Sequence, residues 1–369
     1  MISTFDRYLA REILLPFVAA LLFLTQILLA TQILAQADVL LGAGVSALDL
    51  GAVTVDLVPH FLGYVLPVSF LLGAVVGTGR LAEDRELVAL GAAGVSPARL
   101  VRVPVVLGVA VGAIALWVGL ALEPAGLRDA RVRVNDLIRK NVSSDVRAGV
   151  FFEDIPNLTL YAAETRGGRW RHVLISDRTD PTAPLLALAQ GGHLEPAGPG
   201  ESMRLVLDSG EVHREEPRSD EYVVAHYQHG TITLGFGQTL SERNRLVGSP
   251  FELGPAEIVA RARSAATPDE ARVWWTFLYR RLAAPAAMIA FALVAVPIAA
   301  SRRGGRAFGY AVTILAVVGY YAVLRFGEGL SRRAALPAAL GPNLPNLVFA
   351  AVGAVLIVLM ERRGAGAVR

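Results

Sequence analysis

Residues 101–124 read VRVPVVLGVAVGAIALWVGLALEP, an almost wholly apolar run that stops at Glu123-Pro124. A helix needs about 20 mostly apolar residues to cross a bilayer. The run from Val101 to Leu122 meets that length, and five similar blocks lie at residues 13–37, 53–78, 282–300, 307–326 and 344–360. Charged residues make up 18% of the chain, against about 25% in soluble domains. These features predict a membrane α-helical protein with six transmembrane helices.

The stretch between the third and fourth blocks has the composition of an ordinary globular domain. We therefore predict a 3+3 arrangement, with transmembrane halves at residues 1–122 and 273–369 and an inserted domain at residues 123–272. Residues 127–140 have the apolar spacing of an amphipathic helix. After Gly149 the pattern alternates, which predicts short strands at residues 150–155, 158–164, 171–177, 185–190, 202–208 and 222–236. Separated by turns such as Arg166-Gly167-Gly168, these strands indicate a sandwich, jelly roll or barrel.

Arginine residues are distributed unevenly over the short loops, and cytoplasmic loops are the ones enriched in Lys and Arg. Arg7 and Arg11 precede the first block, whereas residues 38–52 contain no basic residue. If the helices alternate in direction, most of the other flanking arginines fall on the same side as Arg7: Arg80, Arg85, Arg99, Arg102, Arg302, Arg303, Arg306, Arg362, Arg363 and Arg369. Only the loop with Arg325, Arg332 and Arg333 disagrees. Both termini are predicted to be cytoplasmic and the inserted domain external.

Residue chemistry gives little support to an enzyme. The chain has no cysteine, which excludes disulfides, thiol catalysis and zinc–thiolate sites. No Gly-x-Ser-x-Gly elbow, His-Glu-x-x-His pair or Walker-type phosphate loop occurs. Histidines gather in the inserted domain, but alternation places His226 and His229 on opposite faces of a predicted strand. Ordinary histidines, including His193 and His213, are favoured over a metal site, and no catalytic residue is predicted.

Residues 79–100, GRLAEDRELVALGAAGVSPARL, form a longer link than two neighbouring helices need. They predict a short charged helix interrupted at Gly91 and Gly94, then Ser96 as the N-cap of the third span with Pro97 in its first turn. An apolar edge of Leu87, Val88 and Leu90 follows the charges. Such a helix can dock in a groove of a cytoplasmic partner, although a solvated connector is the alternative. The predicted contact residues are Arg80, Glu83, Asp84, Glu86, Leu87 and Leu90.

Glycines spaced four residues apart occur within two of the apolar blocks. Gly73 and Gly77 lie in the second block, and Gly108 and Gly112 lie in the third. Small residues at this spacing let helices approach closely, either as static packing or during motion.

Several stretches together resemble one family, the LptF/LptG permeases that export lipopolysaccharide from the inner membrane of Gram-negative bacteria. The segment at residues 79–100 is similar to the family's signature, and RYLARE at residues 7–12 is similar to its opening. AQGGHL at residues 189–194, LVLDSG at 205–210 and RRLAAP at 280–285, closing on Val296-Pro297, are similar to its later motifs. The resemblance covers nearly the whole chain.

The resemblance implies a periplasmic β-jellyroll and a permease role in an ABC transporter that extracts lipopolysaccharide and passes it to a periplasmic bridge. It implies three protein partners: an LptB-like ATPase dimer, a paired F- or G-type permease and an LptC-like jellyroll membrane protein. ATP and Mg are used by the ATPase, and this chain is expected to bind no cofactor, no metal and no nucleic acid. Residues 38–45, DVLLGAGV, resemble the F type.

Members of the family commonly carry basic residues on the first span, which meet lipid phosphates. This chain instead offers polar residues there, so the expected substrate-lining residues are Thr25, Gln26, Gln32 and Gln36, with Arg325 on the fifth span. Two other functions remain open. A membrane-embedded envelope enzyme would need converging ionisable groups inside the spans, which look nearly free of them. A force-transmitting ABC-type subunit that carries no lipid would need no apolar trough in the inserted domain.

Overall fold

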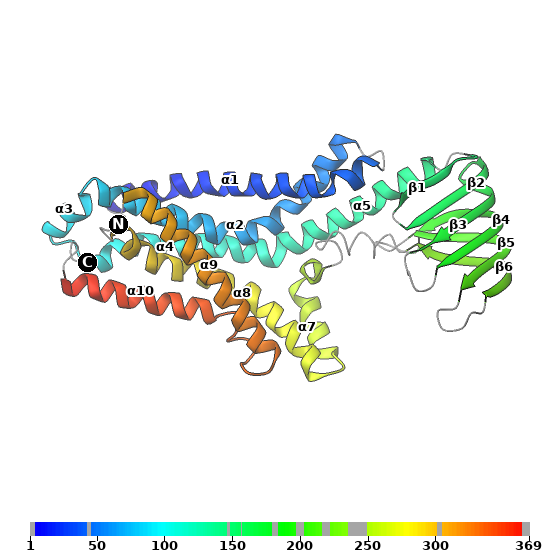
Figure 1. Cartoon of the computed structure of the whole chain (residues 1–369). Coiled ribbons are helices and arrows are strands. Elements are labelled where there is room, and N and C mark those ends of the chain that lie inside the picture. The colour runs from blue at the N-terminus through cyan, green and yellow to red at the C-terminus, as the bar shows by residue number, and fades with distance from the viewer. Residues whose placement is uncertain are drawn as a thin grey trace. The chain divides into compact units, whose positions relative to one another are not determined.

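A computed structural model describes residues 4–42, 46–145, 148–155, 157–178, 184–196, 203–215, 222–234, 249–300 and 305–363 (Figure 1). The chain divides into two compact units. One unit comprises Met1–Ala30, Val58–Pro124 and Leu253–Arg369, and the other comprises Thr31–Leu57 and Ala125–Glu252. The end of the first long helix and the start of the second therefore group with the sheet, a division that the apolar blocks do not indicate.

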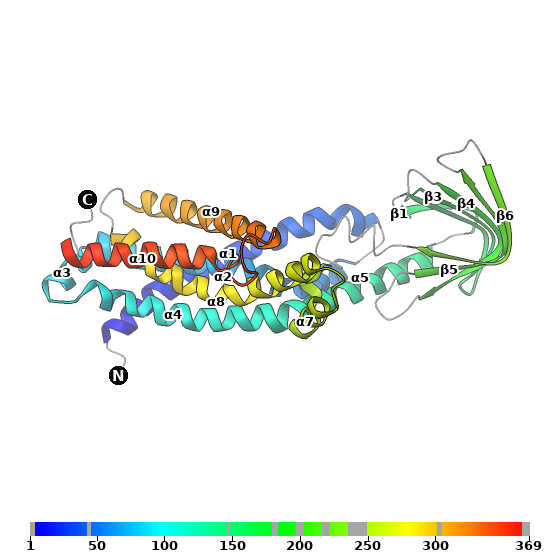
Figure 2. The same cartoon turned by 90° about the horizontal axis from the view of Figure 1, so that it is seen from below.

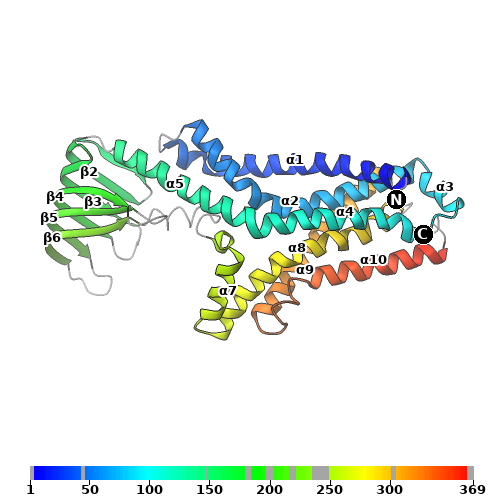
Figure 3. The ribbon, with the colours of Figure 1, turned by 180° about the vertical axis from the view of Figure 1, so that it is seen from behind.

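Six helices of the described chain are long and apolar enough to cross a membrane, which confirms the predicted number of apolar helices. They are α1 (Thr4–Gly42), α2 (Ala47–Glu83), α4 (Pro97–Trp117), α8 (Pro268–Ala300), α9 (Gly305–Arg332) and α10 (Leu344–Arg363). Shorter helices are α3 (Glu86–Ala92) and α7 (Pro255–Ser264), and a 3-10 turn, η2, spans Pro250–Glu252. Within the helical unit, α8 packs against α4, α7, α9 and α10 (Figure 3).

The third long helix continues beyond the apolar run that ends at Leu122. α4 passes through a π-helical turn, η1 (Val118–Leu122), into α5 (Glu123–Asp145). Pro124 lies directly after this turn. A proline inside a helix removes one backbone donor and crowds the carbonyl four residues earlier. The wider π turn accommodates that crowding, so the helix continues beyond Pro124.

Both predicted glycine pairs lie where helices touch. A Cβ added at Gly77 of α2 would stand 2.5 Å from the Glu12 carbonyl oxygen of α1, and one at Gly73 would stand 2.6 Å from Phe17 Cβ. A Cβ at Gly108 of α4 would stand 2.9 Å from the Met288 carbonyl oxygen of α8. Gly112 meets the same helix one turn further on. The close approach predicted from the spacing is confirmed.

The second unit contains a six-stranded antiparallel sheet with its strands in sequential order. The strands are β1 (Phe151–Ile155), β2 (Leu158–Arg166), β3 (Arg169–Asp177), β4 (Leu185–Pro196), β5 (Met203–Glu215) and β6 (Tyr222–Leu234). Gly167 and Gly168 connect β2 to β3 with φ values of 57° and 78°, as a two-residue hairpin turn requires. The predicted turn at this position is confirmed. The inserted domain is therefore an antiparallel β domain.

The sheet is folded across its strands, and Figure 2 shows the strands curving together. The fold line crosses five strands, and on each strand it lies at one residue between the paired positions. These residues are Ala163, His172, Gln190, Ser209 and Gln228. His172 and Ser209 have left-handed φ values of 48° and 40°. A left-handed residue within a strand kinks it and changes which face the next side chain occupies. Val173 and Ile175 are thus buried on one side of the line, and Trp170 is buried on the other.

This change of face explains two errors in the predicted strands. β4 and β5 extend well beyond the predicted residues 185–190 and 202–208. The added residues lie past the fold line, where the alternation no longer continues in phase. The fold line also corrects the prediction that His226 and His229 lie on opposite faces of their strand. The His226 and His229 side chains are 80% and 83% exposed, so neither faces the sheet interior.

The contact at Gly77 generates a stability prediction. We expect Gly77→Ala to lower the unfolding temperature of the detergent-solubilised protein, because the new methyl group meets the α1 backbone. Overpacking of this kind costs about 1–3 kcal/mol. Gly63→Ala is the matched control, because it lies on the same helix and a Cβ there meets nothing within 4 Å. Equal unfolding temperatures for the two variants would contradict the close packing of α1 on α2.

Candidate functional site

The predicted coupling segment is divided into two helices. α2 ends at Glu83, Arg85 takes a left-handed φ of 59°, and α3 begins at Glu86. A left-handed arginine interrupts the helix, so the expected single charged helix is wrong in detail. The Ser96 hydroxyl then accepts a hydrogen bond from the Arg99 backbone N–H, with Pro97 in the first turn of α4. The predicted N-cap is confirmed.

Two polar contacts hold this segment on α1. The Tyr8 hydroxyl donates to the Glu86 carboxylate, at 3.1 and 3.3 Å from its two oxygens. Arg80 Nη1 lies 3.1 Å from Glu12 Oε2. These contacts place the predicted residues Arg80 and Glu86 beside the start of α1.

The apolar edge predicted for this segment faces inward. Leu87 is 3% exposed and belongs to the core of the helical unit, and Leu90 packs against that core. Val88 alone of the three is exposed, at 42%. Glu83 and Asp84 are exposed beside it. The surface open to a partner therefore consists of charged residues and one exposed valine. Leu87 anchors α3 to the bundle.

The predicted substrate-lining residues Thr25 and Gln26 lie on different sides of α1. Gln26 is exposed about 100° around the helix from Thr25. Gln32 is half-buried further along α1. Gln36 belongs to a part of α1 whose side chains lie outside the described residues. The Thr25 hydroxyl is buried without a hydrogen-bond partner. Arg325 is 65% exposed on α9 and pairs with Glu328 of the same helix.

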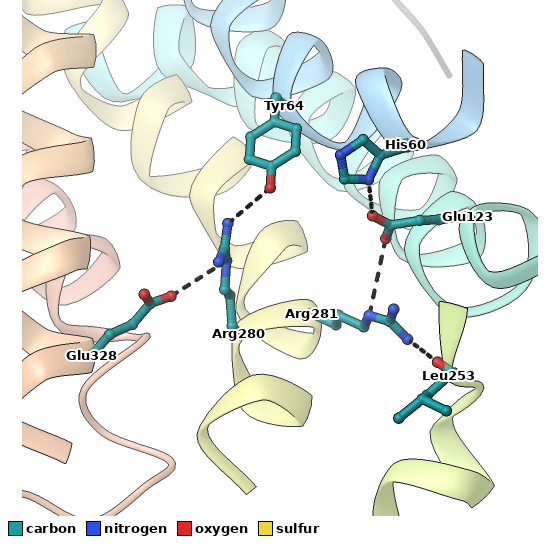
Figure 4. A network of polar contacts seen from close by, with 7 residues as sticks. All are labelled: His60, Tyr64, Glu123, Leu253, Arg280, Arg281 and Glu328. Atoms are coloured by element: carbon teal, nitrogen blue, oxygen red, sulfur yellow. Dashed lines mark hydrogen bonds and ion pairs between the residues drawn. The ribbon is translucent and has the colours of Figure 1, made fainter. Parts of the chain in front are cut away.

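A buried polar network that was not predicted joins four segments of the helical unit (Figure 4). His60 Nδ1 of α2 lies 2.7 Å from Glu123 Oε1, at the start of α5. Arg281 Nε of α8 lies 4.0 Å from the other oxygen of Glu123. Arg281 Nη1 also donates to the Leu253 carbonyl oxygen at 2.7 Å. His60, Glu123 and Arg281 are all 6% exposed or less.

The neighbouring residue on α8 makes a second set of contacts in the same view (Figure 4). Arg280 Nε lies 3.3 Å from Glu328 Oε1, and Arg280 Nη2 donates to the Tyr64 hydroxyl at 3.2 Å. The guanidinium also stands over the Tyr64 ring, 5.8 Å from its centre. Arg325 reaches the other oxygen of Glu328 at 3.3 Å. α8 therefore bonds to α2 and α9 through one arginine.

These ionisable groups lie mostly at the ends of the predicted apolar blocks: His60 is inside one, whereas Glu123, Arg280, Arg281 and Glu328 flank the others. A signal was present, because His60 and Arg280-Arg281 lie within apolar helices, where ionisable residues usually mark function. The arrangement nevertheless pairs each carboxylate with a basic side chain, Glu123 with Arg281 and Glu328 with Arg280. Such pairs connect helices.

Among the described residues, no group of three or more His, Asp or Glu side chains could hold a metal ion. His193 lies close to Glu195 and His229 lies close to Asp208, whereas His213 and His226 both lie close to Glu211. The distances range from 2.8 Å for His193–Glu195 to 3.7 Å for His226–Glu211.

The buried network generates a second stability prediction. We expect Arg281→Met to lower the unfolding temperature strongly, because it leaves the Glu123 carboxylate and the Leu253 carbonyl without their guanidinium. Breaking a buried pair costs about 3–5 kcal/mol. Adding Glu123→Gln should recover part of that loss, since it removes the uncompensated charge. Differential scanning fluorimetry in detergent measures both.

Arg325→Met is the control for this experiment. Its side chain is 65% exposed and also pairs with a glutamate, so its loss should cost at most about 1 kcal/mol. If Arg281→Met and Arg325→Met have equal effects, or if Glu123→Gln adds fully to Arg281→Met, the buried pair does not stabilise the bundle.

No individually curated protein matches the chain. The family model described as lipopolysaccharide export system permease LptF/LptG matches residues 7–359. This match runs from α1 into α10 and includes the sheet and every residue of the network. The chain therefore belongs to the LptF/LptG family of lipopolysaccharide export permeases, which are integral inner-membrane transport subunits and not enzymes.

Proposed function

We propose that this chain is the F-type permease subunit of an ABC transporter that extracts lipopolysaccharide from the inner membrane. In this proposal both termini are cytoplasmic, the sheet is periplasmic and takes the jellyroll role, and the lipid passes through it to a periplasmic bridge. An LptB-like ATPase dimer, a paired permease and an LptC-like protein complete the assembly. The ATPase supplies the energy from ATP and Mg.

The single observation that carries this proposal is the apolar interior of the folded sheet. Leu160, Ile175 and Leu207 are fully buried there, and they come from β2, β3 and β5. Burial raises the pKa of Tyr227, whose hydroxyl donates to the Leu188 carbonyl oxygen at 3.0 Å. Acyl chains need a continuous apolar surface that water does not reach. The two halves of the sheet would provide such a surface on separating.

The edges of the sheet support passage between proteins. β1 and β6 are the terminal strands of the described sheet, and each pairs on one side only. Phe151 is 58% exposed on β1, and Val223 and Val224 are 45% and 42% exposed on β6. An unpaired edge with exposed apolar residues can be extended by a strand of another chain. An LptC-like jellyroll would join at such an edge.

A force-transmitting subunit that carries no lipid is the competing function. It requires no apolar surface continuous across the sheet, yet the buried cluster reaches from Phe152 on β1 to Leu207 on β5, and the partly buried Ile232 of β6 packs against it. This continuity favours the lipid carrier.

The segment around α3 supports the proposed ATPase contact. Glu83, Asp84 and Val88 are exposed, while Leu87 holds α3 on the bundle. A helix anchored in this way can transmit a push to α1 and α2. Tyr8 connects α1 to α3, and Arg80 connects α2 to α1. We propose that Arg80, Glu83, Asp84 and Glu86 face the ATPase. Thr25, with its unpartnered hydroxyl, is the best supported of the proposed lipid contacts.

Photocrosslinking tests lipid passage. A photoreactive phenylalanine derivative replaces Tyr227, whose ring packs on the sheet interior, in the complex with the ATPase. We expect it to capture lipopolysaccharide when ATP is present and not without ATP. The same derivative at His226, which is exposed, is the control. Capture that does not require ATP, or that is equal at both positions, would contradict transport through the sheet.

Copurification tests the ATPase contact. We expect Glu86→Arg to reduce recovery of the LptB-like ATPase by about tenfold, which corresponds to about 1.4 kcal/mol. Because Glu86 also accepts a hydrogen bond from Tyr8, Tyr8→Phe is needed as a control that removes the bond and keeps the carboxylate. If Glu86→Arg leaves assembly and ATP hydrolysis intact, the docking role is wrong. If Tyr8→Phe alone reproduces the loss, Glu86 acts only within the chain.

A further inference from the structure

The outer face of the sheet carries a hollow that lipid passage through the interior does not use. It has a volume of about 440 Å³ and lies over β2, β3, β4 and β5. The residues around it include Arg166, Arg169, Arg171, Gly191, His193 and Asp208. Sites for small ligands typically measure about 300–1,000 Å³, so the hollow is large enough for one small molecule.

Strand register arranges the charged residues in two neighbouring rows. Arg171, Gly191 and Asp208 are paired across β3, β4 and β5. Arg166, Arg169 and His193 form the next row. Gly191 has no side chain, and a Cβ there would stand 3.5 Å from Asp208 Oδ2. The glycine therefore forms a floor beside the Asp208 carboxylate, with arginines at the rim.

Two of these arginines face each other without an acid between them. Arg166 and Arg169 are direct partners at the end of the β2–β3 hairpin, held there by the turn at Gly167 and Gly168. Within the described part of the chain neither forms an ion pair, whereas Arg171 lies 3.9 Å from Glu164. Like charges directly opposite on a hairpin destabilise it. An anion bound between the two guanidinium groups would remove this repulsion.

The remaining groups around the hollow suit hydroxyl groups. The Asp208 carboxylate accepts hydrogen bonds, and the Gln190 amide both donates and accepts. His193 Nε2 lies 2.8 Å from Glu195 Oε1, which leaves its Nδ1 for a ligand. Guanidinium groups bind phosphate or carboxylate through two parallel hydrogen bonds. A ligand that uses both sets carries an anionic group on a polyhydroxyl ring.

We propose that this hollow binds anionic sugars, meaning sugars that bear a phosphate or carboxylate group. The inference rests on the proposed function, in which such sugars belong to the head group of the transported glycolipid. Acyl chains would occupy the sheet interior while the outer hollow holds part of the head group. Because the arginines are exposed, binding is sensitive to salt.

Ligand titration of the full-length protein in detergent tests the proposal, with saturation-transfer NMR as the readout. The probes are glucose 6-phosphate and glucuronate, with glucose and inorganic phosphate as references. We expect both anionic sugars to bind more tightly than glucose or phosphate alone. The double variant Arg166→Gln/Arg169→Gln should weaken binding by about tenfold or more, from the loss of two charge-assisted contacts.

Arg204→Gln is the matched control, because Arg204 is an exposed arginine of β5 that does not line the hollow. It should leave binding unchanged. Gly191→Leu is an independent second variant that fills the floor, and it should also weaken binding. The thermal unfolding of each variant shows whether the fold is intact.

Several results would overturn the proposal. Equal binding of inorganic phosphate and glucose 6-phosphate would show an anion contact without sugar recognition. Equal weakening by Arg204→Gln would show general attraction to positive charge. Loss of an acidic protein partner from the double variant, without any sugar binding to the unmodified protein, would assign the surface to that partner. If the sugars fail to bind while Tyr227 still captures lipid with ATP, this inference fails and the transport function stands.

Discussion

The Glu123 carboxylate is the point on which the helical unit depends. An ionised group inside an apolar bundle must be paired, because an isolated charge there is far more costly than a broken surface contact. Glu123 satisfies this requirement with His60 and Arg281. These two contacts hold α2, the α4–α5 junction and α8 together. The same arginine holds the Leu253 carbonyl, where the chain enters the bundle again after the sheet.

The pairing of Glu123 with Arg281 also agrees with the packing along α4 and α8. These two helices run antiparallel, and Gly108 and Gly112 meet Met288 and Pro285 before the ion pair is reached. Glycines let the α4 and α8 backbones approach where the two helices are apolar. The Glu123–Arg281 ion pair joins them where α4 passes into its π turn. Arg280, one residue away, points to a different neighbour and contacts Glu328 and Tyr64. Adjacent arginines on one helix thus serve two sides of the bundle.

The folded sheet separates two environments within one thin domain. Its interior is apolar from β1 to β6, and its outer face carries arginines and acids of β2 to β5. Both surfaces depend on the fold line, because the left-handed residues His172 and Ser209 keep apolar side chains inside on either side of the bend. A lipid with a charged sugar head presents the same two chemistries in one molecule.

The sequence by itself determined the features that local physics controls. Apolar length identified six helices, Ser96 and Pro97 marked the start of α4, and Gly167-Gly168 marked a hairpin. Four-residue glycine spacing predicted the close helix contacts. Tertiary structure alone decided the rest. Glu123 and Arg281 are far apart in the chain, and no periodic pattern in the sequence predicts their contact. The inward direction of Leu87 and the change of face at His172 are likewise set by what packs against them. Local patterns report which residues prefer to be buried, whereas only the folded chain decides which of them meet.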